Sequence, residues 1–284
     1  MGEENDVLPP EEEDGGGEVK SFLEHLEDLR WTLIKSLTAL ILAMIVCLVG
    51  ASKVAAMLAW PIARANQKLP ADSHIQLNWL DPAAPFLASL HFAFFGGIIL
   101  ASPFIFYYIA QFILPALKVK EKKYFFRACA IGSILFFSGV ATCYLAIMPV
   151  ALLAAVKYGR WLLGGNLPGV VTWWRAELYF SFTVKFMIGM GLGFELPVVL
   201  LTLVKMGVLD YRKLASMRRY MIVISLILGA LLTTPEVVTQ VLMAGPLYLL
   251  YEASVWIAWY WERQEKKKRE TEAALAANQP NSSP

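Results

Sequence analysis

The chain has 284 residues, of which 57% are hydrophobic and 17% charged, and its mean hydropathy is +0.53. This balance lies outside that of a soluble globular domain and predicts a membrane protein. The formal net charge of +2 is too small to indicate a nucleic-acid partner.

The two ends of the chain differ from the middle. Residues 1–20 are acidic and rich in glycine and proline, and they lack the basic start and apolar core of a secretory signal. They contain too little apolar surface to offset the entropy of ordering, so we expect a disordered tail. Residues 263–284 are interpreted in the same way, as a basic-to-polar disordered tail. The expected membrane domain therefore covers residues 21–262.

Six apolar stretches could form membrane-crossing helices, each of which needs about 20 residues. In chain order they cover residues 31–51, 91–114, 124–148, 178–204, 220–232 and 237–259. A short amphipathic segment, 52–60, ends at Pro61 and predicts a helix lying on the outer membrane surface. The fifth stretch is too short for a full crossing, and only TTPE separates it from the sixth, which predicts a tight helical hairpin.

The distribution of positive charge indicates an orientation. Lysine and arginine gather after the second stretch, around the turn between the fourth and fifth, and after the sixth. Short loops rich in these residues face the cytoplasm. The sequence therefore predicts an all-α membrane protein with six transmembrane helices and both termini in the cytoplasm.

Two acidic segments fall on the predicted cytoplasmic side. In SFLEHLEDLR, Ser21 stands three residues before Glu24, which is the spacing of a capping box and predicts a helix start at the membrane interface. Asp28 lies on the polar face of that helix. Glu121 follows the second stretch in the basic loop PALKVKEKKYFF. Taken alone, each acid is typical of an ordinary solvated charge.

Glu195 is different, because it lies inside the apolar run GMGLGFELPVVLL. A charged side chain at the membrane centre costs about 2.5–3.5 kcal/mol on insertion scales. It is either a neutral, hydrogen-bonded structural group or a group that faces a wet cavity or a partner helix, and we favour the second hypothesis. The three cysteines also lie in apolar runs and are interpreted as small buried hydrophobic residues.

Several motifs together resemble the TatC family of the twin-arginine protein translocase. They are HLEDLR at 25–30, WPI at 60–62, SPFIFYYIAQFILPAL with the following KVKE over 102–121, GFELPV at 193–198 and LLTTPEVVTQ at 231–240. The resemblance covers about residues 21–261. It implies a concave, glove-like bundle of six helices in the bacterial cytoplasmic (inner) membrane. It also implies binding of twin-arginine signal peptides and assembly with the single-span subunits TatA and TatB, and with further copies of this chain, to export folded proteins.

The resemblance also implies roles for individual residues. Asp28 and Glu121 match the two acidic positions that receive the arginine pair, and Arg30 and Phe112 match neighbouring motif residues of this signal-peptide site. Many members carry glutamate where this chain has Asp28.

Further matches lie within the membrane and at its outer surface. Glu195 matches a buried polar position in the fourth crossing, Gln240 and Glu236 match positions at the outer end of the last crossing, and Pro61 matches a structural proline of the outer loop. Glu195, Gln240 and Glu236 are thereby expected to contact partners within the membrane.

Two other functions compete with a receptor. A proton-coupled secondary transporter would use Glu195 as its titrating group, but the sequence offers no second buried carboxylate and no internal repeat. An intramembrane enzyme would need a catalytic motif, and neither HExxH nor GxSxG occurs. The sequence therefore predicts a binding and assembly protein without enzymatic activity, cofactor or metal.

Overall fold

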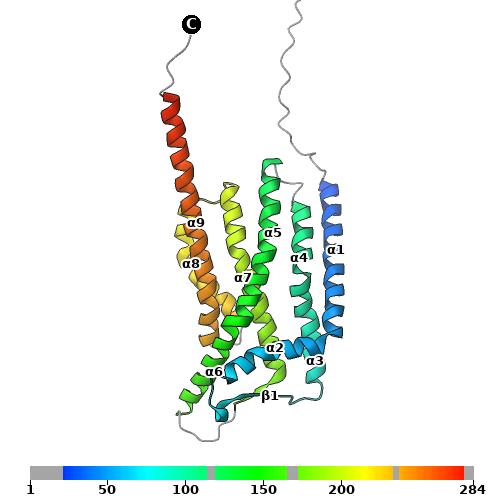
Figure 1. Cartoon of the computed structure of the whole chain (residues 1–284). Helices are drawn as coiled ribbons and strands as arrows, with labels where there is room; N and C mark the ends of the chain where they lie inside the picture. The colour runs from blue at the N-terminus through cyan, green and yellow to red at the C-terminus, as the bar shows by residue number, and fades with distance from the viewer. Residues whose placement is uncertain (1–21, 114–118, 165–171, 233–236, 278–284) are drawn as a thin grey trace, which may run out of the picture.

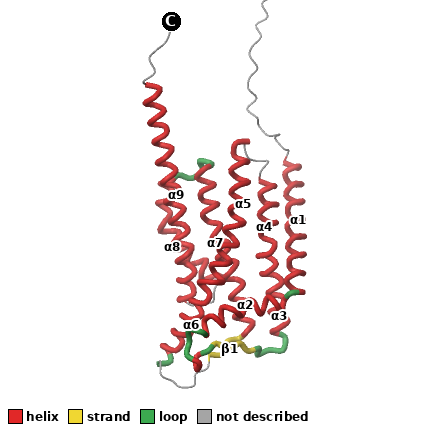
Figure 2. The backbone as a smooth tube through the Cα atoms, in the orientation of Figure 1, coloured by secondary structure: helices red, strands yellow, loops and turns green. Residues whose placement is uncertain are grey.

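The computed structural model describes residues 22–113, 119–164, 172–232 and 237–277, which form an elongated helical bundle (Figures 1 and 2). The α-helices are α1 (Phe22–Val49), α2 (Ala51–Asn66), α3 (Ala84–His91), α4 (Gly97–Ile113), α5 (Val119–Thr142), α6 (Met148–Leu162), α7 (Ala176–Lys205), α8 (Tyr211–Leu232) and α9 (Val237–Ala277). Two π turns, η2 (Phe92–Gly96) and η4 (Cys143–Ile147), join α3 to α4 and α5 to α6, and a short 3-10 turn, η1 (Ala71–Ser73), precedes the first strand.

Within these residues, six helical stretches are long and apolar enough to cross a membrane. They are Leu23–Val49, Ala84–Ile113, Phe125–Leu162, Ala176–Lys205, Tyr211–Leu231 and Gln240–Glu272. The predicted all-α fold with six membrane helices is therefore confirmed. The second and third stretches are longer than expected, because the chain stays helical through the π turns instead of ending at the apolar boundary.

One end of the bundle is covered by short elements. Helix α2 lies across the ends of the long helices and packs against α6 (Figure 1). Strands β1 (Ile75–Asn78) and β2 (Thr172–Arg175) pair in parallel beside it. The sequence predicted a helix over 52–60 on this surface, and the observed helix is longer because it continues through Pro61.

Two tyrosines fix α2 at its proline. Pro61 has no N–H, so it cannot donate to the carbonyl of Met57 four residues earlier. The Tyr144 hydroxyl donates to that Met57 oxygen at 2.7 Å, and the buried Tyr179 hydroxyl donates to the neighbouring Leu58 oxygen at 2.7 Å. The Met57 carbonyl, which Pro61 leaves without a helix donor, thus accepts a hydrogen bond from η4. The neighbouring Leu58 carbonyl accepts one from α7.

Glycines let α5 and α7 approach closely. A Cβ added at Gly139 would come within 2.9 Å of the Met190 carbonyl oxygen, and one at Gly191 would come within 2.8 Å of the Phe136 ring. Lipid gives membrane helices no hydrophobic drive to associate, so they depend on close packing. Small residues at such positions allow that packing. The α5–α7 interface is therefore the tightly packed centre of the bundle.

Helix α8 differs from the sequence prediction. It begins at Tyr211, nine residues before the expected start at 220, so Arg212, Lys213, Arg218 and Arg219 lie on the helix and not in a turn. The apolar window ended early because Arg218 and Arg219 interrupt it. The whole helix has 22 residues, which is long enough for a crossing. The turn expected at TTPE lies outside the described residues.

Helix α9 also extends beyond its expected end. It reaches Ala277, so residues 263–277, expected as part of a disordered tail, are helical. Glutamate, lysine, arginine and alanine dominate this segment and are strong helix formers, and Glu262 and Lys266 have the i, i+4 spacing that supports a helix. Residues 1–20 and 278–284 lie outside the described part of the chain.

The two tyrosine hydrogen bonds can be tested by removing the hydroxyls. Tyr144→Phe and Tyr179→Phe should each lower the free energy of unfolding by about 1 kcal/mol, because each removes a hydrogen bond to a carbonyl of α2. Thermal unfolding of the purified protein in detergent measures the effect. The control is Tyr158→Phe, whose side chain is 52% exposed in the same part of the molecule. Equal loss in all three variants would contradict the assignment.

Candidate functional site

The end of the bundle opposite α2 gathers the predicted cytoplasmic residues. The start of α1, the end of α4 and the start of α5 lie next to one another there (Figure 1). The same end holds the start of α8 and the last part of α9, which carry the basic residues counted in the sequence. The topology therefore places segments that are far apart in sequence on one surface.

An aromatic stack joins α1 to α4 at this end. The rings of His25 and Phe112 lie 4.6 Å apart between centroids and are nearly parallel, with an interplanar angle of 22°. Asp28 follows His25 by three residues on α1, which puts the two on neighbouring positions of one helix face. Asp28 is half-buried. The structure thus brings Phe112 to the helix face that carries Asp28.

The other two residues of the predicted site have different positions. Arg30 is exposed near the start of α1. Glu121 lies in the first turn of α5, on the same end of the bundle, but its side chain is outside the described residues. Glu24 and Glu27 are both exposed on the same segment of α1 as Asp28. The start of α1 is therefore an acidic surface beside otherwise basic helix ends.

Glu195 lies at the α5–α7 interface. A Cβ added at Gly132 of α5 would come within 2.6 Å of the Glu195 Oε2 atom, so the carboxylate occupies the space that a larger residue would fill. The Oε1 atom is enclosed and has no hydrogen-bond partner among the described residues. The side chain as a whole is half-buried. The carboxylate therefore lies between α5 and α7, with one oxygen that accepts no hydrogen bond from the described residues.

Gln240, near the start of α9, forms a hydrogen bond within the chain. Its Nε2 atom donates to the Leu226 carbonyl at 2.8 Å, and Gly229 lets the two helices approach there, since an added Cβ would lie 3.0 Å from the Gln240 carbonyl oxygen. Gln240 therefore joins α9 to α8. Glu236 lies outside the described residues.

An ion pair that the sequence analysis did not identify also joins α8 to α9. Arg218 donates to both carboxylate oxygens of Glu252, from Nε at 3.0 Å and from a terminal nitrogen at 2.7 Å, and the Trp256 indole donates to the same carboxylate at 3.0 Å. The paired residues are 34 positions apart, and nothing in the local sequence connects them. The tyrosines that hold α2 were missed for the same reason.

Comparisons with known proteins agree with this geometry. The profile of a family described as Sec-independent protein translocase protein (TatC) matches residues 24–246. A protein of that name from Aquifex aeolicus is 34% identical over 246 residues, which are 86% of this chain and 97% of the relative. One from Akkermansia muciniphila is 36% identical over 199 residues, 70% of this chain and 56% of the relative.

Solved structures give the same result. A crystal structure of the twin-arginine translocase receptor TatC matches with a TM-score of 0.69 and 35% identity, covering 82% of this chain and 97% of that one. The helical bundle and its polar end define a multi-pass membrane protein of the protein-translocase class. The chain belongs to the TatC family. Its members are components of a protein translocase and not enzymes. This favours the receptor hypothesis over a solute transporter and over an intramembrane enzyme.

The position of the Glu195 carboxylate can be tested with a double-mutant cycle. Gly132→Ala alone should destabilise the protein by about 1–3 kcal/mol, because the new methyl group overlaps the carboxylate. In the background of Glu195→Ala the same change should be close to neutral, which gives a coupling of about 1 kcal/mol or more. Thermal unfolding measures the three variants. Gly159→Ala is the control, because an added Cβ there meets nothing within 4 Å. Additive effects at 132 and 195 would place the carboxylate elsewhere.

Proposed function

We propose that this chain is the receptor subunit of a twin-arginine translocase, which binds the arginine pair of signal peptides at Asp28 and Glu121. The observation that carries the proposal is the stack of His25 on Phe112, because it holds the acidic start of α1 against the end of α4. The backbone of Glu121 begins the next helix on the same end of the bundle. The start of α1, the end of α4 and the start of α5 lie at the same end of the bundle (Figure 1), which supports a shared site.

The chemistry of the surface suits an arginine pair. A guanidinium group is a planar fork of donors that a carboxylate matches with two charge-assisted hydrogen bonds. Two arginines in succession need two acidic acceptors from different segments, and α1 and α5 would supply one each. Arg30 and Phe112 would border the site, with the Phe112 ring covering its apolar side.

The proposal includes an orientation. Membership of the TatC family indicates a multi-pass protein of the bacterial inner membrane. We infer that the end carrying the acidic site faces the cytoplasm, since the helix ends there are rich in lysine and arginine. Both described chain ends, the start of α1 and the end of α9, would then be cytoplasmic, and α2 would lie on the outer surface with Pro61 as its structural proline.

Three residues remain as proposed contacts to partners within the membrane: Glu195, Gln240 and Glu236. The enclosed, unsatisfied oxygen of Glu195 supports a role for that residue, because an acceptor in hydrocarbon is stabilised by any donor that reaches it. One amide hydrogen of Gln240 is engaged by Leu226, so a partner would use its remaining polar atoms. The partners would be the TatA and TatB subunits and further copies of this chain.

Binding of a signal peptide tests the proposed site. A fluorescent twin-arginine peptide should bind the detergent-solubilised protein, and Asp28→Ala or Glu121→Ala should each weaken binding roughly 10- to 100-fold, since each removes a charged hydrogen-bond acceptor. A peptide with a Lys-Lys pair should bind similarly weakly to the unmodified protein. The control is Glu262→Ala, which removes an exposed acid from α9. Full binding by both site variants would refute the proposal, provided that their thermal unfolding is unchanged.

Cysteine labelling tests the orientation. Lys157→Cys on α6 should react with a membrane-impermeant maleimide in intact spheroplasts, and Lys266→Cys on α9 should react only after the membrane is permeabilised. Both positions are exposed. The natural cysteines, Cys47, Cys129 and Cys143, are buried or half-buried, and the unmodified protein serves as the background control. The reverse labelling pattern would show that the inferred orientation is wrong.

A further inference from the structure

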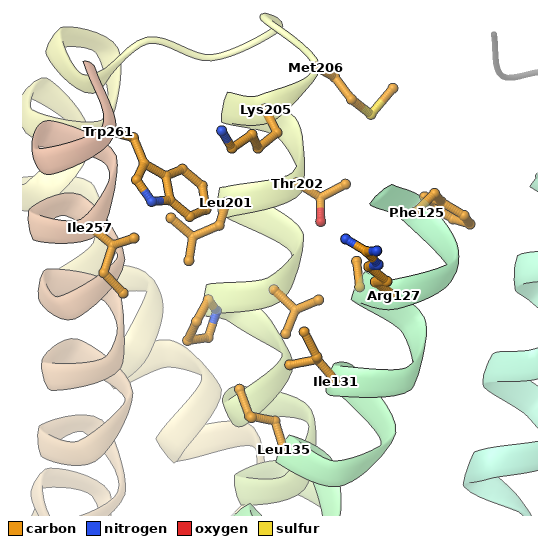
Figure 3. Close-up of a pocket in the computed structure, with 13 residues that line it drawn as sticks. Phe125, Arg127, Ile131, Leu135, Leu201, Thr202, Lys205, Met206, Ile257 and Trp261 are labelled. Atoms are coloured by element: carbon orange, nitrogen blue, oxygen red, sulfur yellow. The ribbon is translucent and has the colours of Figure 1, made fainter. Parts of the chain in front are cut away.

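An open groove with a volume of about 480 Å³ lies between α5, α7 and α9 (Figure 3). It lies near the end of the bundle that carries the acidic site, because Phe125 is close to the start of α5 and Lys205 is the last residue of α7. Its walls are mostly aliphatic and aromatic: Ala128, Ile131 and Leu135 on α5, Pro197, Val198 and Leu201 on α7, and Ile257 and Trp261 on α9. The lining residues follow one another along α5 from 125 to 135 and along α7 from 197 to 206. Its shape and lining therefore match a hydrocarbon chain lying parallel to them.

Polar groups gather at one end of the groove and not along its length. Figure 3 shows the Arg127 guanidinium on α5 facing Thr202 on α7, and the Lys205 ammonium turned toward Trp261. The Lys205 nitrogen lies 4.6 Å from the centre of the Trp261 ring, which holds the cation beside the groove. Among the described side chains, neither Arg127 nor Lys205 has an acidic partner within ion-pair distance.

We propose that this groove binds one anionic glycerophospholipid from the adjacent leaflet. The phosphate headgroup would lie between Arg127 and Lys205, with the Thr202 hydroxyl as a further donor, and one acyl chain would occupy the aliphatic walls. Basic residues between helices at a membrane surface attract anionic headgroups, and burial of the chain adds a hydrophobic contribution. The inference does not depend on the proposed function, because it uses neither Asp28 nor Glu121.

Other occupants fit the groove less well. A free phosphate would use the two cations and leave the apolar walls empty. A zwitterionic lipid such as phosphatidylcholine would fill the walls and offer its phosphate, but its quaternary ammonium group would add a third positive charge beside the two cations. The basic end of a twin-arginine peptide would meet two positive charges, which repel it. An anionic lipid satisfies the cations and the walls together.

Native mass spectrometry of the full chain tests the proposal. The protein is released from nanodiscs that contain equal amounts of phosphatidylglycerol and phosphatidylcholine with identical acyl chains. One phosphatidylglycerol should be retained with a preference of roughly thirtyfold, the amount expected from two cations near a charged headgroup. In the double variant Arg127→Gln and Lys205→Gln this preference should fall nearly to equal retention, while retained phosphatidylcholine stays unchanged.

A matched variant separates this site from general attraction at the membrane surface. Arg212 and Lys213 are both exposed at the same end of the bundle, on α8, outside the groove. Replacing both with glutamine should leave the preference intact, and so should Asp28→Ala. Equal retention of the two lipids by the unmodified protein, or an equal loss in the Arg212/Lys213 variant, would overturn the proposal.

A photoactivatable group in the acyl chain of phosphatidylglycerol gives a second readout that needs no variant. Cross-links should concentrate on the groove residues Ile131, Leu135, Val198 and Leu201. Cross-links spread evenly over the helices would show that the lipid is only part of the surrounding bilayer, and would also overturn the proposal. If the cross-linked occupant of the groove were instead a twin-arginine peptide in the presence of phosphatidylglycerol, the lipid assignment would be wrong.

Discussion

Hydrocarbon offers no hydrogen-bond partner to a peptide group, and this constraint governs how the chain can bend. Each proline within a helix leaves a carbonyl without its usual donor. At Pro61 the donor is the Tyr144 hydroxyl, which comes from a π turn and reaches the carbonyl of Met57, 87 residues earlier in the chain. That π turn ends two residues before Pro149, so one local distortion both accommodates a proline in the following helix and directs a tyrosine to another. The cap formed by α2 follows from these two prolines.

Hydrocarbon also gives helices no hydrophobic drive to associate. This explains why packing at the centre of the bundle depends on glycine. Where α5 meets α7, the absence of side chains at Gly139 and Gly191 admits the bulk of the opposite helix. At Gly132 the vacated space receives a carboxylate instead of an apolar group. The polar character of this interface therefore comes from one residue on α7, and its position comes from one missing side chain on α5.

The sequence predicted the features that depend on composition and local spacing. Six membrane-length helices, the short helix before Pro61 and the family were all correct, because apolar length and motif order are readable along the chain. The start of α8 was placed too late, because Arg218 looks like the end of an apolar window until Glu252 is seen beside it. The helical continuation of α9 was missed since charged composition alone does not distinguish a solvated helix from a disordered segment. For the candidate site, the sequence nominated Asp28 and Phe112 separately, and only the fold shows the His25 stack that joins their helices.

Helix α9 contains 41 residues. At about 1.5 Å per residue its length is roughly 60 Å, about twice the thickness of the hydrocarbon layer. A continuous helix of this length behaves as a stiff rod, so a sideways force on its charged segment produces a torque on the part inside the membrane. The weakest point along the rod is Pro246, where one backbone hydrogen bond is missing. A sideways load on the charged segment would therefore bend the helix first at Pro246, which lies between that segment and the contact of Gln240 with α8.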